Sequence, residues 1–229
     1  MKARLIQSRE IAPLTRHFEF ESPEWPAAFV PGQFLSVTAT LGDDEITRAY
    51  SIVSPPGGGN RFALCANLVQ DGHLSPFLFA LPSGGEIDFK GPYGAFTLRR
   101  PVSDSIFVAT GTGIAPFRSM LLSQLNANPD RRFTLIFGVR HQHGLLYHDE
   151  FSMLAETHPN FDYQPTLTRP PGNWTARTGR VQSYAMEALG ERRDVDVYIC
   201  GLREMVDDVR LKLKEAGLDR KRIIYEKYD

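Results

Sequence analysis

The sequence predicts two domains, an antiparallel β-barrel over residues 1–99 followed by an α/β domain with a parallel sheet over residues 100–229. Three observations lead to this fold class. Short β-type segments separated by turn residues fill the first part. Apolar strands alternate with helical stretches after Arg99-Arg100-Pro101. The 229 residues, 42% of them hydrophobic, are enough to bury two modest cores.

The barrel strands are expected at segments bounded by clusters of glycine and proline, a spacing typical of small antiparallel barrels. A short helix over residues 74–81 interrupts them, with Ser75 as its N-cap and Pro76 at its first position. The start of this helix offers amide groups to an anion, or the helix only closes the bottom of the barrel. The strands expected are Phe34–Thr38, Ile46–Val53, Phe62–Leu68 and Glu86–Phe89.

The second domain begins with four apolar residues, Ile106–Ala109, which predict a strand buried on both faces. Gly111-Thr112-Gly113 follows, where glycine permits positive φ and a sharp turn, and Pro116 suits the first turn of a helix. A strand, a glycine turn and a helix form a geometry that binds phosphate or a dinucleotide. The same pattern also occurs in turns that bind nothing, and Pro116 stands where the dinucleotide fingerprint has its third glycine.

Further strands and helices alternate through the rest of the chain. Met205, Val209 and Leu213 form one apolar stripe on the last helix, which is expected to stop at Gly217. The strands expected are 133–137 and 195–199, and the helices 116–126, 149–156 and 203–216.

Charge and cysteine content narrow the function. The net charge is −1 and both signs are spread along the chain, which argues against a nucleic-acid or membrane-surface binder. Charged residues at the start rule out a signal-peptide pattern, and no apolar run is long enough for a membrane helix, so the cytoplasm is the expected location. Cys65 and Cys200 lie far apart, so an iron–sulfur cluster or structural zinc is not expected. His141 and His143 are interpreted as a solvated loop, and no metal site is predicted.

Arg48-Ala49-Tyr50-Ser51 combines a cation for a pyrophosphate, an aromatic face for stacking and a hydroxyl, which together suit a flavin. It is followed in order by Gly72-His73-Leu74-Ser75, Gly91-Pro92-Tyr93-Gly94, the Gly111–Gly113 turn and Cys200-Gly201-Leu202. With this ordered set, the chain resembles the ferredoxin–NADP reductase family over essentially its whole length.

The resemblance implies that the barrel binds FAD. Arg48 would pair with the pyrophosphate, Tyr50 would stack on the isoalloxazine, and Ser51 would place its hydroxyl near flavin N5, with Ala49 part of the same motif. Cys65, Ala66 and Asn67 would line the flavin on the next strand, where many relatives carry a lysine in place of Asn67. His73, Leu74 and Ser75 would present donors to the phosphates.

In the second domain the resemblance implies NADP(H) binding at Gly111, Thr112 and Gly113, with Thr112 on the nicotinamide side. Cys200 would face the nicotinamide, or it is a small apolar residue that fills a strand end. Glu226 would be an acid near the nicotinamide, and Tyr228 would stack on the flavin face opposite Tyr50. A frayed, exposed terminus is the alternative for these last residues.

The 2′-phosphate of NADP adds negative charge that cations and hydroxyl groups can match. Thr168 and Arg169 stand where relatives carry Ser-Arg, Arg180 stands where bacterial relatives place a second arginine, and Arg140 could add a third positive charge. Together they favour NADPH over NADH.

The function implied is an FAD oxidoreductase in which hydride passes from NADPH to flavin N5 and electrons pass singly to ferredoxin or flavodoxin, a transient partner of a monomer. Ser51, Cys200 and Glu226 would tune this geometry as catalytic residues. Three alternatives stay open at this point: an NAD(P)H:flavin reductase, the reductase component of an oxygenase, and a non-catalytic FAD-binding subunit or nucleotide sensor.

Overall fold

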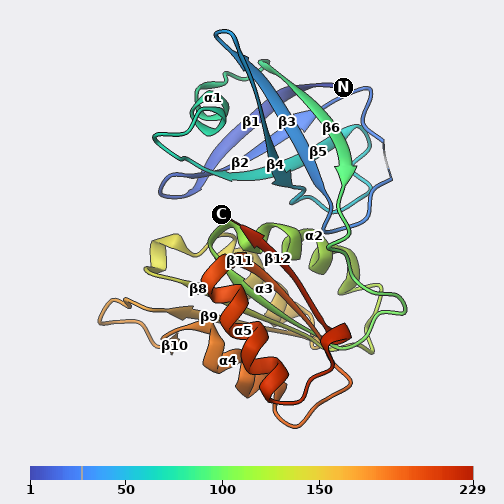
Figure 1. The fold of residues 1–229 in the computed structure, drawn as a ribbon, viewed down its shortest axis with the longest axis vertical. Coiled ribbons are helices and arrows are strands. Elements are labelled where there is room, and N and C mark those ends of the chain that lie inside the picture. The colour runs from blue at the N-terminus through green and yellow to red at the C-terminus, as the bar shows by residue number, and fades with distance from the viewer. Residues whose placement is uncertain (27, 229) are drawn as a thin grey trace. The chain divides into compact units, whose positions relative to one another are not determined.

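The computed structural model describes residues 1–26 and 28–228. Their contacts form two units (Figure 1), unit 1 with Met1–Thr97 and Ala115–Ser123, and unit 2 with Leu98–Ile114 and Gln124–Asp229. Unit 1 holds an antiparallel sheet and unit 2 a parallel sheet covered by helices, which confirms the predicted fold class. The division into two domains at residue 100 stays a prediction.

Unit 1 is built on six antiparallel strands in the order β4-β3-β6-β1-β2-β5. A single bridge between Ile52 and Leu64 joins the chain after β4 to β5, so that the two outer strands of the sheet approach each other. Phe18, Phe20 and Phe62 are buried in its core. The strands are β1 (Lys2–Ala12), β2 (Thr15–Glu21), β3 (Phe34–Leu41), β4 (Asp44–Ser51), β5 (Arg61–Asn67) and β6 (Glu86–Tyr93).

Helix α1 (Leu74–Ala80) starts at the expected residue, but its N-cap is His73 and Pro76 is its third residue. The prediction that Ser75 caps this helix is wrong. Its hydroxyl accepts a hydrogen bond from the Val69 amide at 2.9 Å, and it therefore holds the preceding loop instead of a helix amide.

Helix α2 (Ala115–Gln124) also packs within unit 1. Arg118 donates to the Val53 carbonyl at 2.9 Å, and Ser119 donates to the Ser54 carbonyl at 2.7 Å. These two bonds tie the helix to the segment that follows β4.

Unit 2 has a six-stranded parallel sheet in the order β10-β9-β8-β7-β11-β12. Its central strand β7 (Ser105–Thr110) is buried throughout at Ile106–Ala109, as the apolar run predicts. The other strands are β8 (Phe133–Val139), β9 (Phe161–Leu167), β10 (Arg177–Thr178), β11 (Asp196–Leu202) and β12 (Ile223–Tyr228).

Helices α3 (His148–Thr157), α4 (Val181–Leu189) and α5 (Arg203–Glu215) belong to unit 2. The stripe of Met205, Val209 and Leu213 on α5 is buried, as predicted. Short 3₁₀ turns are η1 (Gly111–Ile114), η2 (Gln142–Gly144) and η3 (Arg220–Arg222).

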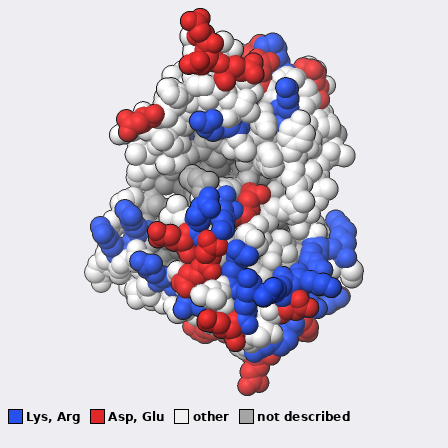
Figure 2. Space-filling model, viewed as in Figure 1, with Lys and Arg blue, Asp and Glu red and all other residues white. Residues whose placement is uncertain are grey.

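Two further features bear on function. Among the described residues, no helix has the length and apolar character needed to cross a membrane. Lys and Arg side chains are mixed with Asp and Glu on the face shown in Figure 2, in keeping with the net charge of −1.

Candidate functional site

The turn after β7 brings two segments of unit 2 into close contact. Gly111 has φ +55°, as expected for a left-handed glycine. The expectation of positive φ is wrong for Gly113, which is needed for a different reason: a Cβ there would lie 2.3 Å from the Cys200 carbonyl oxygen. Only glycine lets η1 approach the backbone of β11 this closely. Thr112 lies between them and is half-buried.

Cys200, Glu226 and Tyr228 gather at the carboxyl ends of β11 and β12. Cys200 is fully buried and lies opposite Glu226 in the strand register, and Leu202 lies opposite Tyr228. Burial raises the pKa of the Cys200 thiol well above its usual value, and the charge of Glu226 raises it further, while a hydrogen bond with Tyr228 acts against both. Burial also raises the pKa of Glu226. The cluster therefore holds a protonated thiol beside a carboxyl group that keeps its proton longer than an exposed one.

The outer face of β12 is fixed to α5 by a network that the sequence interpretation missed. Lys227 pairs with Asp207 at 2.8 Å, Asp207 also binds Arg210 at 3.0 Å, and the Arg210 guanidinium lies 3.5 Å from the centre of the Tyr225 ring. Because side chains alternate along a strand, anchoring residues 225 and 227 sets the orientation of residues 226 and 228 on the opposite face. The alternative of a frayed, exposed terminus is therefore wrong as far as residue 228, because β12 is paired with β11 along its whole length.

Three arginines lie at the carboxyl ends of neighbouring strands. Arg140 follows β8, Arg169 follows β9, and Arg180 follows β10 as the N-cap of α4. The Arg169 amide donates to the Arg140 carbonyl at 2.8 Å, which brings the first two side by side, and Thr168 donates to Val139. All three side chains are exposed, and no guanidinium partner is found for them among residues 1–26 and 28–228. Ligands of open α/β sheets bind at this edge, so the arrangement suits an anion.

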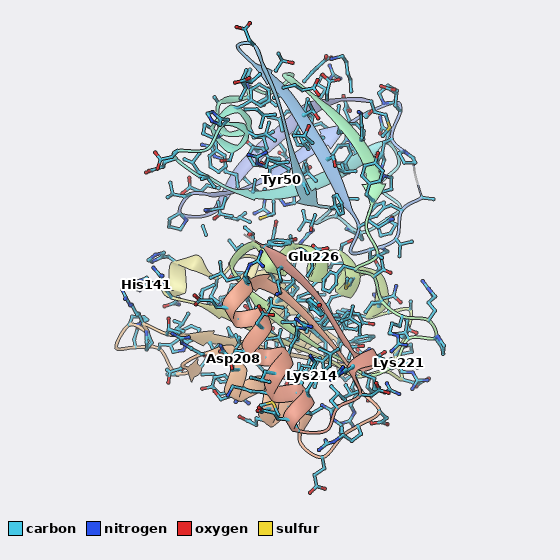
Figure 3. The ribbon with its side chains drawn as sticks, in the orientation of Figure 1. Tyr50, His141, Asp208, Lys214, Lys221 and Glu226 are labelled. Carbon is cyan, nitrogen blue, oxygen red and sulfur yellow. The ribbon has the colours of Figure 1, made fainter. Side chains whose placement is uncertain are left out.

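A cavity of about 700 Å³ opens beside Arg169. Its lining comes from the loop after β8 and the loop after β9. The position of the first loop can be found in Figure 3 by the label of His141. The imidazole rings of His141 and His143 stack with their centroids 5.3 Å apart. The residues that line the cavity are His141, Gln142, His143, Arg169, Pro170 and Pro171.

The flavin motif of unit 1 lies where β4 ends beside β5. Ser51 precedes Ile52 and Cys65 follows Leu64, the two residues of the antiparallel bridge. The structure therefore brings the Arg48–Ser51 and Cys65–Asn67 segments together. Tyr50, labelled in Figure 3, is half-buried, and burial raises its pKa to about 12 while the charge of Arg48 acts against this shift. A neutral phenol ring next to an exposed guanidinium provides a stacking surface and an anion partner, which fits FAD.

The remaining predicted FAD residues differ in whether the structure already uses their polar groups in hydrogen bonds. The N-cap of α1, His73, makes no side-chain cap bond, so the first turn of the helix presents its amides at Leu74 and Ser75. The hydroxyl of Ser75 is already bonded to Val69, and Asn67 accepts a hydrogen bond from Thr15 at 3.0 Å. Ser51 is buried, with 6% of its surface exposed, and Ala49 is exposed on β4.

His17 lies opposite Cys65 in the β2–β5 register. Burial lowers the pKa of His17 to about 4, and the charges of Arg118 and Arg9 act in the same direction. An unfolded chain would titrate it at 6.5, so the unfolded state binds more protons between pH 6.5 and about 4. Stability should therefore fall as the pH falls through this window, by up to about 3 kcal/mol.

Urea unfolding of the wild type and His17→Gln at several pH values checks this expectation. The variant should lose this part of the pH dependence, and the matched variant His158→Gln should keep it. Equal slopes in the wild type and His17→Gln would contradict the assignment.

Comparison with known proteins adds two family models. The oxidoreductase FAD-binding domain matches residues 2–98, and the oxidoreductase NAD-binding domain matches residues 107–211. The first covers the strands of unit 1. The second runs from within β7 to within α5 and includes the three arginines and Cys200.

The chain is 38% identical to ferredoxin–NADP reductase B of Sorangium cellulosum, over 100% of this chain and 97% of the relative. It is 33% identical to the toluate 1,2-dioxygenase electron transfer component of Pseudomonas putida, over 88% of this chain and 59% of that protein. The crystal structure of a ferredoxin–NADP⁺ reductase from Neisseria gonorrhoeae with bound FAD and NADP is similar with a TM-score of 0.84 and 25% identity, covering 100% of this chain and 97% of the other. The chain belongs to the ferredoxin–NADP reductase family and is an FAD-dependent oxidoreductase that takes electrons from NAD(P)H.

Proposed function

We propose that this protein passes electrons between NADPH and a one-electron carrier, ferredoxin or flavodoxin. The observation that carries the choice of NADPH is the row of three exposed arginines, Arg140, Arg169 and Arg180, at the carboxyl ends of β8, β9 and β10. The carrier is proposed from the similarity to the Sorangium reductase over the length of both chains. The domain boundaries 1–99 and 100–229, a monomeric state and a cytoplasmic location belong to the same proposal.

Unit 1 would hold FAD through positively polarised groups for the diphosphate and an aromatic ring for the isoalloxazine. Arg48 and the first amides of α1 would bind the diphosphate, and Tyr50 would provide the stacking surface for the ring. Ser51, Cys65, Ala66 and Asn67 would border the ring at the junction of β4 and β5. FAD, when bound, supplies the change from two-electron hydride chemistry to single-electron transfer.

Unit 2 would position the nicotinamide at the turn formed by Gly111, Thr112 and Gly113. The contact of Gly113 with the Cys200 backbone fixes the height of this turn relative to β11. Cys200 keeps its proton and is a small, weakly polar group buried beneath this position, and Glu226 adds a carboxyl group whose charge depends on pH. These side chains orient the reactants and exclude water, and form no covalent bond with them.

Arg169→Ala should weaken NADPH much more than NADH, because a hydrogen-bonded charge pair with the 2′-phosphate would be lost. The Michaelis constant for NADPH should rise about 10-fold or more, while that for NADH stays within about twofold. Steady-state kinetics with both nucleotides measures this difference.

Arg131→Ala is the matched control. Arg131 is also an exposed arginine, but it precedes β8 and therefore lies at the amino ends of the strands, away from the three arginines. It should leave both constants unchanged. Equal effects of Arg169→Ala on NADPH and NADH would remove the 2′-phosphate assignment.

The electron acceptor is tested by reducing the FAD-loaded protein with NADPH without oxygen and then adding ferredoxin, flavodoxin or free FMN. Rapid reduction of a carrier protein, with FAD still bound after gel filtration, is the expected result. Preference for free FMN together with loss of FAD on gel filtration would favour a flavin reductase. The similarity to the toluate dioxygenase component supports a second candidate, the reductase of an oxygenase, which would require electron transfer to an oxygenase partner and none to ferredoxin or flavodoxin.

A further inference from the structure

Two histidines share the cavity of about 700 Å³ with Arg169. His141 is the N-cap of η2, and His143 lies within this turn, so both are placed by the loop that follows β8. Both side chains are exposed, and their rings are nearly parallel, with 16° between their planes. The solvated-loop interpretation accounts for their exposure but not for their position in this cavity.

The charges around the cavity favour an anion. Arg169 is the one residue with a permanent charge in the described lining, which contains no carboxylate. Arg140 is adjacent, because its carbonyl accepts the hydrogen bond from the Arg169 amide. The carboxylates that follow in the chain, Asp149 and Glu150, lie in the first turn of α3 and are not part of the lining. His148 contacts the Tyr163 hydroxyl at 3.2 Å and likewise does not line the cavity.

The stacked pair also has a consequence for protons. Two imidazolium ions with ring centres 5.3 Å apart would repel each other, and Arg169 in the same lining adds a third positive charge. An anion that carries two negative charges would remove this repulsion and favour protonation of the imidazoles. Imidazole is the side chain that ordinarily changes charge between about pH 5 and 8.

We propose that His141 and His143 complete the binding site for the ribose 2′-phosphate of NADPH and take up a proton from solvent when this phosphate binds. The inference rests on the proposed function and adds its regulation, because the preference for NADPH over NADH would increase as the pH falls from about 8 toward about 6.5. Arginine keeps its charge throughout this range, so Arg169 provides the part of the attraction that does not depend on pH. The histidines provide the part that does.

Calorimetry on the FAD-loaded protein tests this without relying on turnover. Adenosine 2′,5′-bisphosphate is the probe and adenosine 5′-monophosphate the reference, each titrated near pH 7.5 in two buffers that differ in ionisation enthalpy. A phosphomonoester has already lost most of its second proton at this pH, so proton uptake on binding reports on titrating groups of the protein. We expect the wild type to take up roughly half a proton or more with the bisphosphate, and much less with the monophosphate.

His141→Gln/His143→Gln should abolish the extra uptake and weaken the bisphosphate about fivefold, with the monophosphate unchanged. His158→Gln, on the far end of α3, is the matched control and should behave as the wild type. Uptake that persists in the double variant would overturn the inference. If Arg169→Ala weakens the bisphosphate and the double variant does not, only the histidine inference fails. If neither change affects the bisphosphate, the 2′-phosphate site of the proposed function fails as well.

Discussion

Gly113→Ala is expected to lower the free energy of unfolding by about 3 kcal/mol and to slow reduction of the bound flavin by NADPH by more than about tenfold. The added Cβ would lie 2.3 Å from the Cys200 carbonyl oxygen and 2.7 Å from the Gly201 nitrogen. Both are backbone atoms of a buried strand, so the contact cannot be relieved by turning a side chain. Either η1 or β11 must move, and both border the proposed nicotinamide position.

Chemical unfolding and stopped-flow reduction measure the two effects. Gly172→Ala is the matched control, since it lies in an exposed loop, has nothing within 4 Å of its added Cβ and has no positive φ. It should unfold and react as the wild type. A Gly113→Ala protein with wild-type stability and a wild-type rate would show that η1 does not depend on the contact with Cys200.

Glu226→Gln is expected to slow hydride transfer by about 10- to 100-fold with little change in FAD content, because the residue lies in unit 2 and would act on the nicotinamide. Burial raises the pKa of Glu226 above its ordinary value of 4.5. The wild-type rate should therefore rise with pH through a titration above pH 4.5, as the ionised carboxylate favours the positive charge that develops on the nicotinamide. The variant should lack this step.

Pre-steady-state flavin reduction over a range of pH measures both the rate and the titration. Glu204→Gln, an exposed residue in the first turn of α5, is the control and should retain the wild-type profile. An unchanged profile in Glu226→Gln would assign the titration to another group. Cys200→Ala should leave the titration in place, since the thiol stays protonated when its pKa is raised.

The local sequence pattern was sufficient to predict the elements whose buried residues are close together in the sequence. Four consecutive apolar residues predict β7, and the stripe on α5 predicts its buried face, because each signal is carried by neighbouring residues. Helix α4 was not predicted, although Val181, Ala185 and Leu189 form a buried stripe after Gly179 and Arg180.

The site depends on register, which local pattern does not contain. Arg169 and Arg180 were predicted from the resemblance and Arg140 as a further positive charge, and the parallel order β8, β9, β10 is what places all three at the same end of the sheet. Cys200 and Glu226 meet because β11 and β12 pair residue by residue, and Lys227 reaches Asp207 on α5 for the same reason. Gly113 was identified correctly as necessary, but the reason is close approach to a strand distant in sequence, which only the folded chain shows.

Anaerobic titration of the purified protein with NADPH tests most directly that unit 1 binds FAD and unit 2 delivers electrons to it. The protein should be yellow, should keep its flavin through gel filtration, and should lose its visible flavin absorbance on addition of about one equivalent of NADPH. A colourless protein that does not take up added FAD under native conditions, or a bound flavin that NADPH does not reduce, would contradict it.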